Sequence, residues 1–191
     1  NAYMEIPVGK SIGVVGSSGA GKTTIIDVLL GLLVPSGGRV TCDGKDIQDN
    51  YASWLHNIGY IAQNIYMLDT TIRENVAFGE DVSKADEKRI WEVLREAQME
   101  DYIRSLPEGL DTVIGDRGVR LSGGQRQAVT LLMASLQKPK LLLLDEVAAG
   151  LTEAEVHEVM KMVADLKAAK YSIIWIEHVI QTMVESTDHL M

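Results

Sequence analysis

The sequence lacks several features that would assign it to a class of proteins. It contains one cysteine, Cys42, so no internal disulfide can form and a reducing compartment is expected. No apolar run approaches the ~18 residues that span a bilayer, and no signal peptide opens the chain. Lys and Arg are scattered, and a net charge of −9 disfavours a nucleic-acid partner. If the chain works at a membrane, another protein must hold it there.

Short apolar runs alternate with helical patterns along the chain, which predicts an α/β fold with a largely parallel sheet. The composition is 46% apolar and 24% charged, which is ordinary for a soluble folded protein. At 191 residues the chain is long enough for one or two closely joined lobes. The predicted strands are Ser11–Val15, Arg39–Cys42, Ile58–Ala62, Leu141–Leu144 and Ser172–Ile176, and the predicted helices are about Lys22–Leu32, Gly124–Gln137 and Thr152–Lys170.

The middle of the chain has a different pattern. From Ser83 to Leu106 apolar residues such as Ile90 recur at helical spacing, with charged residues on the opposite face. A Pro-Glu-Gly turn signal ends this stretch. We therefore interpret residues 64–121 as a mostly helical insertion into an α/β core that consists of residues 1–63 and 122–191.

Residues Gly16–Thr23 (GSSGAGKT) match the phosphate-loop pattern at every fixed position. They follow a predicted strand and precede a predicted helix, as this motif requires. The glycines let successive N–H groups surround a phosphate, Lys22 would reach the β- and γ-phosphates, and the Thr23 hydroxyl would ligate Mg²⁺. The alternative is a glycine-rich turn that binds nothing. The residues predicted to bind nucleotide here are Gly16, Ser17, Ser18, Gly19, Ala20, Gly21, Lys22, Thr23 and Thr24.

Two carboxylates, Asp145 and Glu146, directly follow the unbroken apolar run Leu141–Leu144. Such a run is expected of a strand covered on both faces, and ligands of α/β sheets gather at the carboxyl end of such strands. Asp145 suits the outer coordination shell of Mg²⁺, and Glu146 is placed to polarise the attacking water. Alone, these acids could simply mark the point at which a strand emerges into solvent. Beside a phosphate loop, the catalytic interpretation is favoured.

Gln63 and His178 follow two further predicted strands, level with the other motifs. From this position Gln63 could approach both the metal and the water. A lone glutamine or histidine is usually structural, so neither residue would indicate a site by itself. Their placement after predicted strands favours a role beside the phosphate loop.

The stretch Leu121–Gln125 (LSGGQ) predicts a second place for a phosphate. Its two glycines allow the backbone to approach a ligand closely, and Ser122 with Gln125 has the spacing of a helix capping box. A helix start of this kind attracts a phosphate, although the chain already has a phosphate loop 100 residues earlier. Two phosphate-seeking loops together with a catalytic acid suggest an ATPase whose site is shared by two subunits.

With these motifs in this order, the chain resembles the nucleotide-binding domain of ABC transporters over nearly its whole length. This resemblance implies a P-loop NTPase (RecA-like) core with a helical subdomain. The matching motifs are Gly16–Thr23 with the Walker A motif, Gln63 with the Q-loop, Leu121–Gln125 with the signature motif, Leu141–Asp145 with the Walker B motif, and His178 with the switch histidine.

The resemblance also implies roles for residues. Glu146 would be the general base, with Gln63 and His178 as further catalytic residues, and Thr23, Gln63 and Asp145 would hold Mg²⁺. Ser122 and Gly124, with Gly123 and Gln125 beside them, would bind the γ-phosphate of ATP held by the opposite subunit. The implied partners are a second nucleotide-binding domain, in a head-to-tail homodimer or pseudo-dimer around two ATP, and a transmembrane transporter subunit. The implied location is the cytoplasmic face of a membrane, with no nucleic-acid partner.

The resemblance changes along the chain. Residues 1–127 are similar to exporter-type domains, for example in Asp69–Val76 and Pro107–Gly118. Residues 140–191 are instead similar to branched-chain amino-acid importer ATPases, for example in Glu146–Glu155. This change along the chain is compatible with a divergent natural sequence, a recombinant and a chimera.

Two alternatives to a transport motor stay open at this point. One is a soluble ABC-type ATPase, which the acidic charge and the short distance between phosphate loop and signature disfavour. The other is a nucleotide-binding module with impaired hydrolysis. Three departures from the family suggest it. Thr152 stands where the D-loop usually ends in Asp, and the aromatic residue that normally stacks on adenine is missing, since Tyr3 does not replace it. We also expect the usual final strands and helices to be lacking after Met191.

Overall fold

Five strands form one parallel sheet in the computed structural model, which describes residues 3–17, 19–78, 86–96, 99–136, 138–177 and 187–190. The strand order is β4-β5-β6-β1-β7, and every neighbouring pair runs parallel. The predicted parallel sheet is therefore confirmed. The strands are β1 (Ser11–Val15), β4 (Ile58–Ile61), β5 (Leu141–Asp145), β6 (Ser172–Glu177) and β7 (His189–Leu190).

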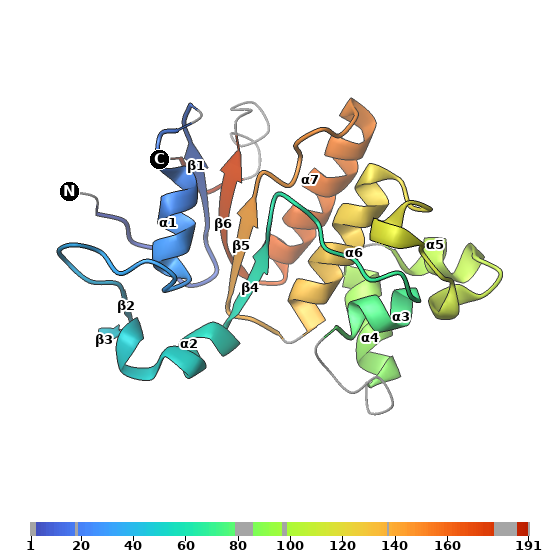
Figure 1. Cartoon of the computed structure of the whole chain (residues 1–191), viewed down its shortest axis with the longest axis horizontal. Helices are drawn as coiled ribbons and strands as arrows, with labels where there is room; N and C mark the ends of the chain where they lie inside the picture. Colours follow the sequence, from blue (N-terminus) through green and yellow to red (C-terminus); the bar gives the residue numbers. More distant parts are fainter. Residues whose placement is uncertain are drawn as a thin grey trace.

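Helices cover both faces of this sheet. Helix α1 (Lys22–Leu29) lies on one face, while α6 (Gly123–Leu136) and α7 (Glu153–Ala168) lie on the other (Figure 1). Side chains of β5 alternate between two buried clusters. Leu141 and Leu143 pack with α1, whereas Leu142 and Leu144 pack with α6 and α7. A central strand covered on both faces needs an unbroken apolar sequence, which explains the leucine run.

A group of smaller helices lies beyond α6, on the right of Figure 1. Helices α3 and α4 contact α6 directly. Their buried side chains join the same apolar cluster as α6 and α7. Among the described residues, no helix is both long and apolar enough to cross a membrane. The remaining elements are the short helices η1 (Ile47–Asn50), α2 (Tyr51–His56), α3 (Ile72–Val76), α4 (Glu87–Glu96), α5 (Glu100–Ser105), η3 (Gly109–Asp111) and η4 (Asp116–Gly118), and the strands β2 (Thr41–Cys42) and β3 (Lys45–Asp46).

Two predicted elements differ from the structure. The predicted strand Arg39–Cys42 is wrong as a strand of the main sheet: only Thr41–Cys42 is extended, and it pairs antiparallel with β3. Asp43 and Gly44 both have positive φ in the turn between them, as a two-residue hairpin of the type I′ class requires. Helix α1 ends three residues earlier than predicted, because Gly31 takes a left-handed conformation after the helix.

The helical middle of the chain is confirmed, but the continuous helical pattern from Ser83 to Leu106 divides into α4 and α5. Residues 79–85, 97 and 98 lie outside the described residues. Ile90 and Ile103, one from each helix, are fully buried. Helix α3 was not predicted, although Thr71 and Glu74 form a reciprocal capping box at its start. A helix of one turn is too short for periodicity to reveal it.

Strand β7 was not predicted either, and Asp188 holds it against β1. The Asp188 carboxylate accepts hydrogen bonds from the backbone N–H of Ser11 at 2.9 Å and from its hydroxyl at 3.1 Å, and Lys167 Nζ lies 3.1 Å away. These bonds, the Ser11 N–H first, hold the pKa of Asp188 at about 2, well below its usual value. Contacts between distant segments therefore hold this strand, and an isolated sequence window does not contain them.

Replacing Gly59 by alanine is expected to destabilise the fold by about 1–3 kcal/mol, in the range for overpacking a core. A Cβ at position 59 would lie 2.7 Å from the Ala134 carbonyl oxygen and 2.7 Å from Leu142 Cδ2, so β4 could not approach α6 as it does. Urea unfolding measures the effect. Gly37→Ala is the matched control, since a Cβ there would meet nothing within 4 Å. Equal stability of both variants would contradict this packing argument.

Candidate functional site

The phosphate loop, Gln63, Asp145 and Glu146, which the sequence predicts as one site, gather at the carboxyl end of the parallel sheet. The phosphate loop follows β1, Gln63 comes two residues after β4, and Asp145 is the last residue of β5. Because parallel strands bring their carboxyl ends to one edge, residues far apart in the sequence meet there. His178 directly follows β6 but lies outside the described residues, so its predicted role stays a prediction.

The phosphate loop curls around the amino end of α1. Gly19 and Gly21 both have positive φ, which side-chain-bearing residues rarely adopt, and Gly21 is the residue that begins α1. Lys22 is buried and its ammonium group donates to the carbonyl oxygens of Gly16 at 2.8 Å and Ser17 at 3.0 Å. These bonds hold the lysine across the loop. Ser18 lies outside the described residues.

A cavity of about 420 Å³ opens beside this loop. Its lining is mostly polar and combines phosphate-loop residues with two of the predicted catalytic residues, Gln63 and Glu146. The amino end of α1 contributes N–H groups and the positive end of the helix dipole, and Lys22 adds a full positive charge. These groups fit a phosphate chain. The lining residues from the loop and α1 are Gly19, Gly21, Lys22, Thr23 and Thr24.

Gln63 and Glu146 contact each other across this cavity. The Gln63 amide Nε2 donates to Glu146 Oε2 at 2.6 Å, although 83 residues separate the two. Glu146 has a φ of 51°, a left-handed conformation that is uncommon for a residue with a side chain. Its N–H donates to the Ile176 carbonyl at 2.9 Å, which holds this conformation against β6. A strained backbone that neighbouring strands hold in place is typical of functional sites.

Asp145 is buried at the end of β5, beside a residue that the sequence did not reveal. The hydroxyl of Tyr60, on β4, donates to Asp145 Oδ2 at 3.5 Å. Burial, and then the charge of Glu146, raise the pKa of Asp145, while the Tyr60 hydroxyl lowers it. Burial and the Asp145 charge likewise raise the pKa of Tyr60. An aromatic residue in a strand usually belongs to the core, so only the contact across the sheet identifies Tyr60.

The site has few protein ligands for a metal ion. Among the residues described, no group of three or more His, Cys, Asp or Glu side chains could hold one. Mg²⁺ in phosphate-transfer sites commonly takes only one or two protein ligands, together with phosphate oxygens and waters. The hydroxyl of Thr23 in the cavity and the carboxylate of Asp145 are oxygen ligands of this kind. The donor set therefore fits Mg²⁺ bound with a nucleotide.

The signature stretch begins helix α6, and its predicted capping box is confirmed. The N–H of Ser122 donates to Gln125 Oε1 at 2.9 Å, and the N–H of Gln125 donates to the Ser122 hydroxyl at 3.2 Å. In Figure 1 the start of α6 lies on the other side of the sheet from the phosphate loop and α1. None of the described residues from 121 to 125 lines the cavity beside Lys22. The structure thus separates the two predicted phosphate sites.

Glu177, at the end of β6, was also not singled out by the sequence. It is buried, and its Oε1 accepts from the backbone N–H of Ala148 at 2.8 Å and from Trp175 Nε1 at 3.4 Å. The bond to Ala148 ties β6 to the loop that follows Glu146. That loop ends at Thr152, which forms a reciprocal capping box with Glu155 at the start of α7.

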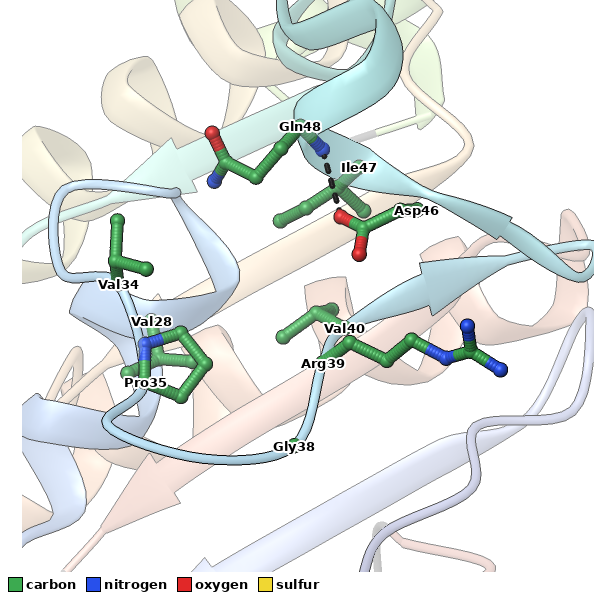
Figure 2. Close-up of a pocket in the computed structure, with 9 residues that line it drawn as sticks. All are labelled: Val28, Val34, Pro35, Gly38, Arg39, Val40, Asp46, Ile47 and Gln48. Carbon is green, nitrogen blue, oxygen red and sulfur yellow. Dashed lines mark hydrogen bonds between the residues drawn. The ribbon is translucent and has the colours of Figure 1, made fainter.

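A second, smaller hollow of about 70 Å³ lies at the opposite end of α1 (Figure 2). Val28, Val34 and Pro35 form its apolar side, and Asp46 accepts from the Gln48 N–H at 3.0 Å on the other. Val28 belongs to the last turn of α1, whereas the phosphate loop precedes the first. The hollow is therefore separate from the cavity that contains Lys22, and it contains none of the predicted site residues.

Comparisons with known proteins agree with this arrangement. A family model described as ABC transporter matches residues 1–149. The chain is 37% identical over 182 residues to the mitochondrial potassium channel ATP-binding subunit of Mus musculus, covering 94% of this chain and 25% of that protein. It is 43% identical over 156 residues to multidrug resistance protein 1 of Entamoeba histolytica, covering 80% of this chain and 12% of that protein.

A solved structure of a bacterial Atm1-family ABC exporter with ATP bound superposes with a TM-score of 0.83 at 30% identity. That match covers 96% of this chain and 32% of the exporter chain, so this chain spans about a third or less of the proteins that it matches here. The ordered motifs, the parallel sheet with its phosphate loop, and these similarities lead to one conclusion. The chain belongs to the ABC transporter family, as an ATP-binding domain.

Proposed function

We propose that this chain binds and hydrolyses ATP as the motor domain of a transporter, and that two such domains close head to tail around two Mg-ATP. The observation that carries the proposal is the separation of the two phosphate-seeking helix starts. The cavity beside Lys22 contains a base candidate, Glu146, but it does not contain the described residues of Leu121–Gln125. A second domain placed head to tail would bring its own signature stretch to this cavity.

Within the proposed site each residue has a defined task. Lys22 and the N–H groups at the start of α1 bind the phosphate chain, and the phosphate oxygens replace the loop carbonyls as partners of the lysine. Gln63 fixes one oxygen of Glu146 through the 2.6 Å hydrogen bond. The other oxygen of Glu146 is then oriented toward an attacking water and accepts its proton. His178 is proposed to contact the γ-phosphate.

The charge that develops on the phosphates requires further stabilisation. Mg²⁺, when bound, neutralises charge on the β- and γ-phosphates. Thr23 and Asp145 are proposed to hold it, with Gln63 close to both metal and water. Asp145 is buried at the end of β5, where the Tyr60 hydroxyl contacts its carboxylate. Closure of two domains would exclude bulk water from the reaction.

The proposal extends to the surroundings of the domain. Residues 1–63 and 122–191 are proposed as the ATP-binding core and residues 64–121 as the helical subdomain. The names of the relatives, an ATP-binding subunit of a channel and an exporter with ATP bound, support a transmembrane partner for this chain too. We propose that this partner determines which solute moves.

The proposal is tested by the oligomeric state of the Glu146→Gln variant with and without Mg-ATP. Glutamine cannot act as the base, so hydrolysis should be blocked. Its amide has the size of the carboxylate and can still bond to Gln63, so an ATP-bound dimer should accumulate. Size-exclusion chromatography coupled to light scattering measures the mass. A shift from monomer to dimer on addition of Mg-ATP is the expected result. A variant that binds ATP but stays monomeric at every concentration would contradict the shared site.

A further inference from the structure

The carboxylate of Glu155 lies against the start of helix α6, inside its own chain. Glu155 belongs to the first turn of α7, and its Oε1 accepts from the backbone N–H of Gly124 at 3.1 Å. The Ser122 hydroxyl also interacts with this carboxylate and helps to lower its pKa. The signature stretch therefore has an anion on its donors in the absence of any second domain.

Glu155 occupies space that is free because the signature stretch has two glycines without side chains. A Cβ at Gly123 would lie 3.0 Å from Glu155 Oε1, and a Cβ at Gly124 would lie 3.3 Å from Glu155 Cγ. Glu158, one turn along α7, is also close, since its Oε2 would lie 3.1 Å from a Cβ at Gly124. The start of α6 thus faces two acidic side chains of α7.

The donors that Glu155 engages are the same two groups that the proposed function assigns to the partner's ATP. We propose that Glu155 is an internal competitor of the γ-phosphate for Ser122 and Gly124, and that it sets the affinity with which two ATP-bound domains close. This inference rests on the proposed function, because it requires the signature stretch to bind a phosphate in trans. Within that function, Glu155 would be a residue that opposes closure of the two ATP-bound domains.

Glu155 and the γ-phosphate compete because both need the same hydrogen-bond donors and because both are negatively charged. A γ-phosphate oxygen placed on the Gly124 N–H would be within contact distance of the Glu155 carboxylate, so one anion must leave. Two anions at one helix start also repel each other at short range, where the positive end of a single helix attracts both. Closure must therefore break charge-assisted hydrogen bonds within each chain before it makes those between the chains.

Protonation cannot relieve this competition near neutral pH. The backbone N–H of Thr152, then that of Gly124, then the Thr152 hydroxyl lower the pKa of Glu155 to about 2. The carboxylate is therefore charged at neutral pH. After closure the carboxylate would keep its hydrogen bonds to Thr152, whose N–H and hydroxyl lie 3.0 Å and 2.9 Å from Oε2. Return of Oε1 to Gly124 would favour reopening once phosphate has left.

The decisive variant is Glu155→Gln, placed in the Glu146→Gln background so that ATP is not consumed. Glutamine is accepted at this capping-box position, so the start of α7 should be retained. It removes the charge and weakens the contact to Gly124. Sedimentation velocity at saturating Mg-ATP should show a dimer Kd at least about tenfold lower, as expected for the loss of one charge-assisted hydrogen bond from the monomer.

The matched control is Glu153→Gln in the same background. Glu153 is exposed in the same first turn of α7, so this variant removes an equal charge from the same helix. Its dimer Kd should stay within about twofold, because exposed charges away from a contact are worth little. Glu158→Gln, which leaves the capping box untouched, should tighten the dimer by less than Glu155→Gln. Thermal unfolding without nucleotide verifies that each variant is folded.

The possible results separate the two proposals. A tighter dimer for Glu155→Gln than for Glu153→Gln supports the competition. A dimer that is unchanged or weaker overturns it and makes Glu155 a structural tether between α6 and α7. If Glu146→Gln and the double variant both bind ATP without dimerising, the shared site itself is wrong. If only the double variant dimerises at the concentrations tested, the competition is supported, and the dimer Kd of the single variant lies above those concentrations.

Discussion

Replacing Lys22 by alanine is expected to weaken ATP binding by about a hundredfold and to reduce turnover to background. Among the described residues that line the cavity, the ammonium group supplies the only full positive charge, and charge-assisted hydrogen bonds to phosphate would be lost. The variant also loses the bonds that connect Lys22 to Gly16 and Ser17 across the loop. Equilibrium binding of a fluorescent ATP analogue and a phosphate-release assay measure the two effects.

The matched control is Lys45→Ala, which removes an exposed lysine from the hairpin of β2 and β3. It should bind and hydrolyse ATP as the parent chain does. Thermal unfolding without nucleotide distinguishes a binding defect from a folding defect. Hydrolysis that continues unchanged after Lys22→Ala would mean that the activity belongs to a contaminant or that the site lies elsewhere.

Replacing Glu146 by glutamine is expected to lower the turnover number by about 10²–10⁴-fold, the range for loss of a general base, with little change in ATP affinity. The amide keeps the size of the carboxylate and still offers an oxygen to Gln63 Nε2, 2.6 Å away. It cannot accept the proton of the attacking water. Single-turnover hydrolysis, with ATP binding measured in parallel, isolates the chemical step from product release.

Glu153→Gln serves again as the control, because it removes a carboxylate of equal charge outside the cavity. Its turnover should match that of the parent. If Glu146→Gln hydrolysed ATP at the parental rate, the base would have to be another group. If it lost ATP binding as well, the effect would be on the structure of the loop between β5 and α7 and not on proton transfer.

The helices and strands of the core could be predicted because each has a local cause. Leu141–Leu144 must be buried on both faces, and Thr152 with Glu155 begins α7 by its own capping bonds. The boundaries that were wrong depend on backbone conformation at single residues. Gly31 ends α1 in a left-handed conformation, and Asp43 with Gly44 turns a predicted sheet strand into a separate hairpin.

The candidate site could be predicted in its parts and not in its contacts. Phosphate-loop glycines, a lysine and a strand that ends in acids have a recognisable chemistry at fixed spacing. Tyr60 and Glu177 have no such pattern, since an aromatic or an acid at a strand end is compatible with many roles. They were found only because the parallel sheet places Tyr60 beside Asp145 and Glu177 beside Ala148.

The sequence by itself determined the phosphate loop, the capping box at the start of α6 and the parallel sheet, since these follow from interactions between neighbouring residues and from the period of apolar side chains. Only the tertiary structure decided which groups meet. The 2.6 Å contact between Gln63 and Glu146 joins residues 83 apart, and the contact between Gly124 and Glu155 joins residues 31 apart. The physical reason is that these contacts depend on how β4, β5, α6 and α7 pack, and packing is a property of the whole chain.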